Sequence, residues 1–431
     1  MEVFSIVILL FSFLLLLSIG TPVAWSIIIS SLFTLLVSVP FLPALTTISQ
    51  RMATGIDSFA LLAIPFFILS GELMNKGGVA HRLVAFAKAL VGFLPGGLAL
   101  INVISAMLMG SVAGSAMASA SAMGSILGPE MEKEGYSKGF GVAINITSAT
   151  TGLVIPPSNI LIVYSLASGG ASIAALFLAG YIPGILTGLF LMAVAMIWAK
   201  KKNFKTGKRA PLKTVFGSFV RAFPSLMLLF VVIGGIVSGV FTATEASAIA
   251  VIYTLVLGFI YKEITFKTLP TILLKSSTTT AIVMFLIGAS MSMSWLLSYE
   301  NIPEMISSGI LSLSDNKIVI LLLINFTLLF VGIFMDMTPA VLIFTPIFLP
   351  IVTQLGIDPV HFGIIMILNL CIGLCTPPVG SVLFVGVGVA NTSIQKVIKP
   401  LIPLFLAMIV ALLLVTYIPA LSLWLPSIFD L

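Results

Sequence analysis

Gly152-Leu153-Val154-Ile155-Pro156-Pro157 is related to Gly373-Leu374-Cys375-Thr376-Pro377-Pro378, which follows it 221 residues later inside another long apolar run. The same offset relates further positions on either side of the two stretches: Pro129 and Pro350, Gly135 and Gly356, and Ser172-Ile173 and Ser393-Ile394. Proline removes a backbone donor and clashes with the preceding helical turn, at about 3 kcal/mol or more. The two stretches therefore predict two repeats, each containing one broken helix.

The composition shows whether the chain is surrounded by water or by lipid. Only 34 of its 431 residues are charged, which is 8%, and 59% are hydrophobic. An average soluble domain carries roughly 25% charged residues. A soluble enzyme, a nucleic-acid-binding protein and a disordered protein are all excluded by this balance. The composition indicates an all-α polytopic membrane protein, because helices satisfy their own backbone hydrogen bonds in lipid.

A membrane-spanning helix needs about 20 apolar residues. Ten stretches are predicted to cross the membrane: 3–20, 23–39, 58–74, 139–165, 174–199, 222–240, 246–261, 278–297, 362–389 and 401–419. The first has no basic start, so it is expected to be a retained helix rather than a signal peptide. Two further apolar runs, 96–130 and 318–352, are interrupted by small or polar residues and are predicted to be re-entrant hairpins. Segments 80–94 and 262–276 carry spaced charges and are predicted to be interfacial helices or ordinary connecting loops.

The charges predict the orientation. The strongest basic cluster lies in the loop 200–216 and has no acidic residue: Lys200, Lys201, Lys202, Lys205, Lys208, Arg209 and Lys213. Such loops are cytoplasmic, which places both termini in the periplasm if the chain lies in a bacterial inner membrane. Glu72, at the end of a predicted span, is expected to face the membrane interface.

Five crossings in each half imply that the second repeat, 217–431, is inverted relative to the first, 1–199. The first is divided into scaffold helices (1–95), a hairpin (96–130) and a broken helix (139–165). The second is divided in the same way, into 217–300, 318–352 and 360–390. Inverted repeats are typical of secondary transporters, which bind ions and substrate at the repeat interface near the membrane midplane.

The broken helices and hairpin centres carry the candidate chemistry. Freed backbone carbonyls must be buried or line a wet cavity, and such carbonyls suit Na⁺. Carboxylates inside the membrane are costly, so Asp336 at the second hairpin centre is a functional candidate. Further oxygen donors near the breaks are Asn145, Ser158, Asn159, Thr376 and Ser381. The alternatives are plain proline kinks, close helix packing, interhelical hydrogen bonds, and a capping role for Asp336.

These residues resemble the large membrane subunit of tripartite ATP-independent periplasmic (TRAP) transporters over nearly the whole chain. The resemblance is carried by Ala63-Ile64-Pro65-Phe66-Phe67, Ser70-Gly71-Glu72-Leu73-Met74, the small-residue stretch 110–128, Ile155-Pro156-Pro157-Ser158, Gly239-x-Phe241-Thr242-x-Thr244-Glu245-Ala246, Met335-Asp336 and Thr376-Pro377-Pro378-Val379-Gly380. It implies an elevator-type ion transporter fold and Na⁺-coupled uptake of an organic anion. The anion would be delivered by a periplasmic binding protein, and a separate small four-helix membrane subunit would assist. The hairpin and the region 135–146 are particularly similar to sialic acid transporters.

The resemblance also implies two sodium sites. The first falls on Ser111, Gly114, Ser115, Pro156, Ser158 and Asn159. The second falls on Gly332, Asp336, Thr338, Thr376 and Gly380. The substrate is expected near Asn145, Ser158, Thr338 and Ser381.

Three alternatives remain at this point. A stand-alone ion-coupled carboxylate symporter or antiporter of similar fold would need no binding protein. An intramembrane serine protease would use Gly288-x-Ser290 with His361, although a lone G-x-S in a glycine-rich chain carries little information. A purely structural membrane subunit would transport nothing. No phosphate-binding loop occurs in the sequence, so no ATPase activity of its own is expected. We predict a transporter rather than an enzyme.

Overall fold

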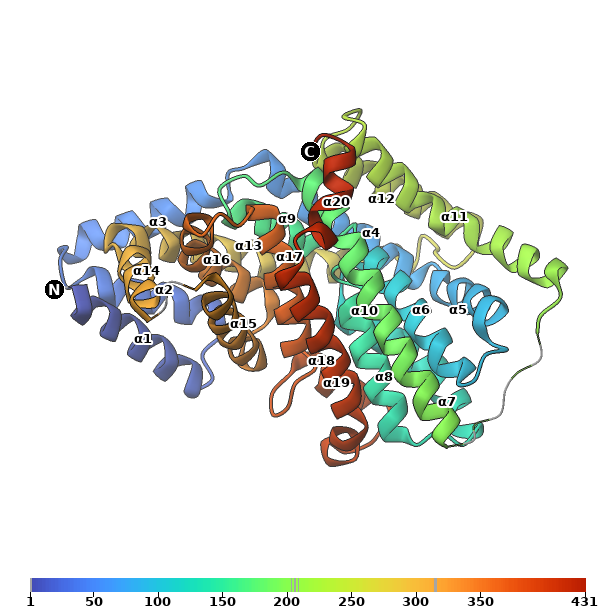
Figure 1. Ribbon diagram of the computed structural model, residues 1–431. Helices are drawn as coiled ribbons and strands as arrows, with labels where there is room; N and C mark the ends of the chain where they lie inside the picture. The colour runs from blue at the N-terminus through green and yellow to red at the C-terminus, as the bar shows by residue number, and fades with distance from the viewer. Residues whose placement is uncertain (1, 203, 205–206, 208, 314–315) are drawn as a thin grey trace.

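The computed structural model describes residues 2–202, 204, 207, 209–313 and 316–431, and Lys205 and Lys208 of the predicted basic loop lie outside these ranges. The described chain is helical and contains no strand (Figure 1). Its first half consists of α1 (Glu2–Ser18), α2 (Val23–Leu35), α3 (Phe41–Ile56), the 3₁₀ helix η1 (Phe59–Leu62), α4 (Ala63–Lys76), α5 (Val79–Val91), α6 (Gly97–Ala113), α7 (Ala116–Lys133), α8 (Lys138–Thr151), α9 (Asn159–Ala167) and α10 (Ile173–Lys201). Its second half consists of α11 (Leu212–Val237), α12 (Ala243–Ile260), α13 (Leu269–Tyr299), α14 (Ile302–Leu313), α15 (Lys317–Phe334), α16 (Met337–Gln354), α17 (Pro359–Gly373), α18 (Ser381–Val389), α19 (Ile394–Tyr417) and α20 (Ala420–Ile428).

Eight helical stretches of the described chain are long and apolar enough to cross a membrane. Shorter apolar helices such as α2 and α17 add to them. Exposed large apolar side chains such as Phe11 and Phe326 cover the outside of the molecule, as expected where lipid is the solvent. The prediction of an all-α polytopic membrane protein is confirmed.

The repeat seen in the sequence is also present in the helix boundaries. Each of the helices α15 to α19 begins 220 to 222 residues after its counterpart among α6 to α10. Thr150 and Cys371 occupy equivalent positions, and the Cys371 thiol donates to the Thr150 carbonyl at 3.1 Å. A contact between equivalent positions is what a two-fold axis between two repeats produces.

Both predicted hairpins are helix pairs, α6–α7 and α15–α16, and both predicted broken helices are interrupted. Each hairpin packs on the break of its own repeat through paired glycines. A β-carbon on Gly110 would lie 2.9 Å from the Cα of Gly152, and one on Gly332 would lie 3.1 Å from the Cα of Gly373. Small residues permit such close backbone approach between membrane helices. The glycines therefore hold each hairpin tip next to a break.

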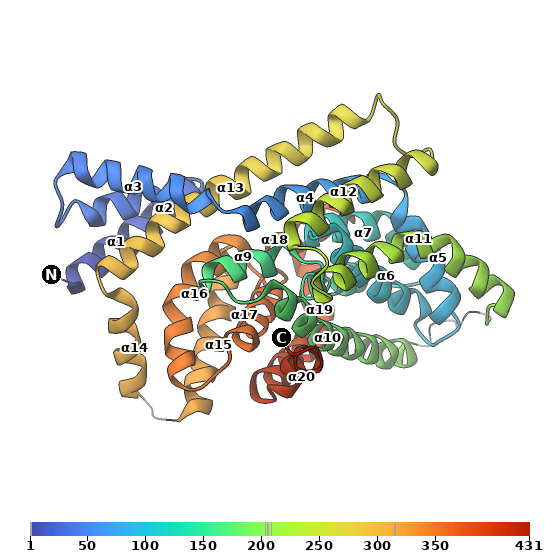
Figure 2. The same cartoon turned by 90° about the horizontal axis from the view of Figure 1, so that it is seen from above.

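The helices predicted to form the scaffold lie together on one side of the hairpins and broken helices. Figure 2 shows α2, α3, α4, α12 and α13 running along one side of the molecule, with the hairpins and broken helices against them. The Thr244 hydroxyl of α12 donates to the Phe59 carbonyl at 2.9 Å, just before α4 begins. Thr242 and Glu245 form a capping box that starts α12. The Thr-x-Thr-Glu motif thus starts α12 and joins it to η1, which leads into α4.

Four features differ from the sequence predictions. Helices α3, α14 and α20 were not predicted, because each is short or carries polar residues that dilute its hydropathy. In the segment 262–276, residues 262–268 form a connecting loop, which was the alternative to an interfacial helix, and α13 already begins at Leu269. The charges of this segment lie partly on a long helix that packs against α3 and α4.

Candidate functional site

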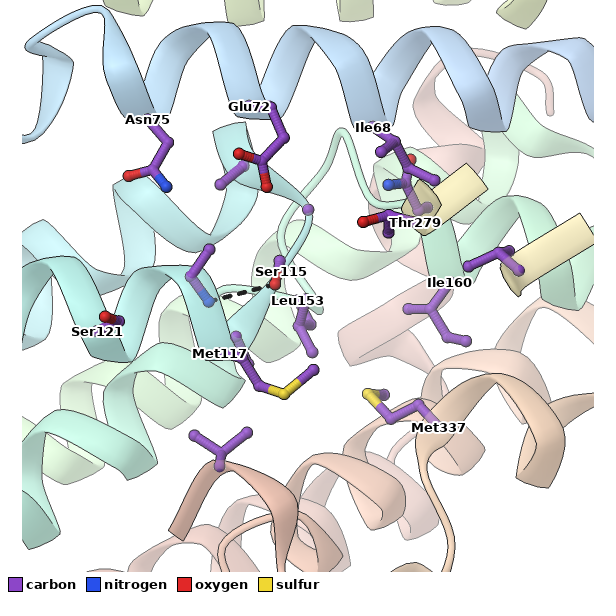
Figure 3. Close-up of a pocket in the computed structure, with 18 of the residues that line it drawn as sticks. Ile68, Glu72, Asn75, Ser115, Met117, Ser121, Leu153, Ile160, Thr279 and Met337 are labelled. Atoms are coloured by element: carbon purple, nitrogen blue, oxygen red, sulfur yellow. Dashed lines mark hydrogen bonds between the residues drawn. The ribbon is translucent and has the colours of Figure 1, made fainter. Parts of the chain in front are cut away.

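One cavity of about 640 Å³ lies between the scaffold and the two hairpin tips. Its walls come from α4 and α13 on the scaffold side, and from both hairpins and both broken helices on the other. Figure 3 shows Glu72 and Asn75 projecting from α4 toward the tip around Ser115, with Met117, Ile160 and Met337 on the facing walls. The fold therefore brings together segments from both repeats around one space.

Four helices begin at this cavity. Residues of the first turns of α7, α9, α16 and α18 line it, including Ala118, Ile160, Thr338 and Val382. Unpaired N–H groups at a helix start make a partial positive charge of roughly +0.5, and such starts bind anions. Two matched pairs of helix N-termini therefore make this cavity favourable for a carboxylate.

Oxygen atoms without partners lie at the same two breaks. Within the described part of the chain, Ser158 Oγ, Asn159 Oδ1 and Ser381 Oγ are buried and make no hydrogen bond. Asn159 and Ser381 are each the first residue of the second half of a broken helix. Leaving a buried polar group unpaired costs about 1–3 kcal/mol. These oxygens fit a hard cation such as Na⁺, which would supply the missing partner.

The structure gathers some predicted site residues on the cavity wall and leaves others behind it. Those on the wall are Gly114, Ser115, Asn159, Asp336, Thr338 and Ser381. Those off the wall, in the adjoining turns of the hairpins and breaks, are Ser111, Pro156, Ser158, Gly332, Thr376 and Gly380. The Ser111 hydroxyl donates to the Leu108 carbonyl at 2.9 Å, and the Thr376 hydroxyl donates to the Ile372 carbonyl at 2.7 Å. A hydroxyl that donates still has lone pairs for a cation.

The two hairpin tips differ in their capping residue. Ser115 caps α7, and its Oγ accepts a hydrogen bond from the Ala118 N–H at 3.2 Å, drawn in Figure 3. Asp336, at the matched position, caps α16 without any side-chain capping bond. Asp336 lines the cavity, and the absence of a side-chain capping bond weakens the capping alternative. The tip of the first hairpin touches its break, because a β-carbon on Gly114 would lie 2.9 Å from Asn159 Nδ2.

Asn145 does not reach this cavity. Its amide Nδ2 donates to the Ala120 carbonyl at 2.7 Å, and its side chain lines a separate small pocket together with Asn102 and Gly124. The structure therefore separates Asn145 from the other residues expected near the substrate.

Comparison of the sequence with known protein families identifies the family of this chain. The family described as "Tripartite ATP-independent periplasmic transporter, DctM component" matches residues 10–421. The chain belongs to this family. Large permease subunits of this kind work with a small membrane subunit and a periplasmic binding protein, and they are transporters rather than enzymes. The family resemblance expected from the sequence is thereby confirmed.

Relatives of this permease are named for different substrates. The "Uncharacterized protein YgiK" of Salmonella typhimurium is 56% identical over 99% of this chain and 98% of its own. The "C4-dicarboxylate TRAP transporter large permease protein DctM" of Pseudomonas aeruginosa is 40% identical over 86% of this chain and 87% of its own. The "Sialic acid TRAP transporter large permease protein SiaM" of Vibrio cholerae is 38% identical over 97% of this chain and 98% of its own. Identity at these levels shows the family and leaves the substrate open.

A solved structure shows the same fold at low sequence identity. The YdaH transporter of Alcanivorax borkumensis superposes with a TM-score of 0.64, covering 91% of the permease and 90% of its own chain, at 14% identity. Identity this low supports the architecture alone.

The sequence did not predict that α4 and α13 contribute residues to the cavity. Glu72 was predicted to face the interface, but it lines the cavity and its carboxylate accepts from the Lys275 ammonium at 2.9 Å. The prediction was wrong because the position of Glu72 at a helix end does not reveal that α13 passes beside it. The Glu72 side chain is 15% exposed. No local signal in either segment predicts this pair, since its members are separated by 203 residues.

The protease alternative has no geometric support in the permease. His361 Nδ1 lies 2.5 Å from the Ser422 hydroxyl, and Nε2 lies 3.4 Å from the Thr416 carbonyl. Both ring nitrogens are thus engaged away from Ser290, which lies on α13. Within the described residues, no three His, Cys, Asp or Glu side chains gather as a transition-metal site requires.

Proposed function

We propose that this permease imports an organic anion, with sialic acid as the first candidate, and that a Na⁺ gradient drives the import. It would act in a bacterial inner membrane, with both termini in the periplasm. It would receive the anion from a periplasmic binding protein and work beside a separate small four-helix subunit. One observation carries the proposal: four helix N-termini and an unpartnered oxygen from each break, Asn159 Oδ1 and Ser381 Oγ, line a single cavity.

The turns at the hairpin tips and helix breaks carry groups suited to an anion and groups suited to a cation. The N-terminal turns of α7, α9, α16 and α18 would attract the substrate carboxylate. The carbonyls and hydroxyls around Ser158, Asn159, Asp336 and Ser381 would hold Na⁺, because hard cations prefer oxygen ligands. Binding of the cation beside the anion would neutralise charge before either crosses the low-dielectric membrane.

Two considerations support sialic acid as the substrate to test first. The cavity of about 640 Å³ is within the range of sites that bury ligands larger than a four-carbon acid. The hairpin and the region 135–146 resemble those of sialic acid transporters. A four-carbon dicarboxylate, carried in the name of the Pseudomonas aeruginosa relative, is the competing substrate class.

We further propose that the hairpins and broken helices move as one body against the scaffold. Their contact with α4 is a glycine contact, since a β-carbon on Gly71 would lie 2.5 Å from the Ala113 carbonyl oxygen. At this position the two backbones approach closely and no large side chain of α4 lies between them. Such movement would expose the cavity alternately to the two sides of the membrane.

Uptake by proteoliposomes that contain the permease, its small subunit and its binding protein would test the proposal. Radiolabelled sialic acid, C4-dicarboxylates and other sugar acids would each be offered with an inward Na⁺ gradient and with K⁺ in its place. We expect uptake of one acid, and its loss when Na⁺ is replaced. Uptake that continues unchanged in K⁺ would refute the coupling, and uptake without the binding protein would favour the stand-alone symporter.

A further inference from the structure

A second cavity of about 720 Å³ lies between the starts of α5 and α11 and is separate from the transport cavity. Its walls carry His81 and Arg82 from α5, and Lys213 and Arg221 from α11. Glu263, in the turn before α13, contributes a single carboxylate. Basic side chains therefore dominate this groove.

Arg82 is held in place by a glycine turn. Gly78 has φ of +69°, and its carbonyl accepts from Arg82 Nη1 at 2.8 Å. The guanidinium carbon lies 3.6 Å from the centre of the Tyr261 ring. A β-carbon on Gly78 would lie 2.9 Å from both Arg82 Nη1 and Glu263 Oε1. Arg82 is thus positioned on the wall, with Glu263 as its nearby counter-charge.

The opposite wall carries positive charge without such compensation. Lys213, Gly217 and Arg221 follow one another at intervals of four residues, so they lie on one face of α11. Neither Lys213 nor Arg221 forms an ion pair with a carboxylate of the described residues. A β-carbon on Gly217 would meet nothing within 4 Å. The missing side chain keeps the groove open between the two cations.

Apolar side chains lie directly beside the basic ones. Leu212, Phe216 and Val220 on α11 are 85%, 70% and 52% exposed. A helix with a basic stripe next to an exposed apolar stripe is typical of the membrane interface. Basic pockets between membrane helices bind lipid head groups. Inorganic phosphate would use the basic stripe alone, whereas a phospholipid would use both stripes.

We propose that this groove binds the phosphate head group of an anionic phospholipid. Lys213 and Arg221 contact the phosphate, because Arg and Lys are the preferred phosphate partners. Arg82 supplies a fixed third cation, and the acyl chains lie against Leu212 and Phe216. A lipid bound there would join α5 to α11 beside the aromatic contact of Phe86 and Phe219, whose ring centres are 5.6 Å apart.

Lipid binding to the delipidated full chain in detergent, followed by native mass spectrometry, would test the proposal. Phosphatidylglycerol is titrated against phosphatidylcholine with the same acyl chains, with and without inorganic phosphate as competitor. We expect preferential binding of phosphatidylglycerol. In the double variant Lys213→Gln/Arg221→Gln its affinity should fall about 30-fold, since each cation near a membrane surface contributes about 1 kcal/mol.

Two further variants distinguish a site from a general charge effect. Gly217→Leu fills the groove and keeps both cations, so it should also lose the preference for phosphatidylglycerol while the thermal midpoint is unchanged. Lys396→Gln/Lys399→Gln removes two exposed cations of α19 and should bind like the native chain. Equal binding of both lipids, equal loss in the control, full competition by inorganic phosphate, or retained preference in Gly217→Leu would each overturn the proposal.

Discussion

The two broken helices share a sequence motif but differ in how they are covered. Residues 151–158 of the first break are all buried, whereas Pro378 and Val379 of the second are exposed. The first break packs on α10 through glycines, since a β-carbon on Gly184 would lie 2.5 Å from Ile155 Cγ1. The matching helix, α19 (Ile394–Tyr417), contains no glycine. The glycines of α10 therefore allow close cover of the first break, and the equivalent helix of the second repeat lacks them.

The hairpin tips show a parallel difference. The first tip has a neutral, satisfied cap at Ser115, and the second has a carboxylate without a capping bond at the matched Asp336. Two repeats of one architecture thus present unequal chemistry to a shared cavity. A fold of two similar repeats can in this way present different ligand groups on the two halves of one cavity.

The largest expected loss of stability and uptake comes from adding a side chain where α10 contacts the first break. A β-carbon on Gly180 would collide with the Val154 carbonyl oxygen, so Gly180→Leu should force the first break away from α10. We expect a loss of about 3 kcal/mol of stability or failure to fold, with uptake abolished. The measurements are the thermal midpoint and proteoliposome uptake.

The matched control for this change is Gly234→Leu on α11, where an added β-carbon meets nothing within 4 Å. It should behave like the native permease. A Gly180→Leu chain with native stability and uptake would show that the glycine contact does not hold the first break.

Making the tips alike should have the next largest effect. In Asp336→Ser the second tip acquires the cap residue of the first, and the carboxylate is lost from the cavity. If the lost carboxylate contact is worth as much as a hydrogen bond to a charged group, about 1.5–3 kcal/mol, the Na⁺ concentration for half-maximal uptake should rise at least about tenfold. The control is Asp57→Ser, at an exposed carboxylate outside the cavity. Unchanged Na⁺ dependence in Asp336→Ser would assign Asp336 to the capping role.

Thiol labelling would compare the coverage of the breaks directly. Val379 is 41% exposed and Ile155 is 9% exposed, so Val379→Cys should react with a maleimide much faster than Ile155→Cys. The native thiols of Cys371 and Cys375 are fully buried and should contribute little background. Equal labelling rates in purified protein would contradict the difference in coverage.

The smallest expected effect comes from removing the buried oxygens that have no hydrogen-bond partner at the two breaks. Asn159→Ala and Ser381→Ala each delete a buried oxygen that has no protein partner among the described residues. Without Na⁺, stability should be unchanged or up to about 1 kcal/mol higher, because an unpaired buried group is lost. The Na⁺-induced rise of the thermal midpoint should shrink in both variants. A native-sized rise in both would remove these oxygens from the proposed cation sites.

Much of this architecture could be predicted from the sequence. Pro156-Pro157 and Pro377-Pro378 break helices through local covalent chemistry, so their positions needed no knowledge of neighbours. The repeat offset anticipated where α6 to α10 and α15 to α19 begin. The hairpin tips could be predicted because small or polar residues interrupt apolar runs there, and Asn159 and Ser381 because they are oxygen donors beside the breaks. Gly114 and Thr338 were implied as site residues by the family resemblance.

Only the tertiary structure decided what surrounds those residues. The pairing of Glu72 with Lys275, the separation of Asn145, and the unequal coverage of the breaks depend on contacts between helices far apart in the chain. Local composition determines whether a helix forms or breaks, because backbone hydrogen bonds are made within a few residues. Which faces of helices meet depends on the packing of side chains over the whole fold, and no single segment encodes it.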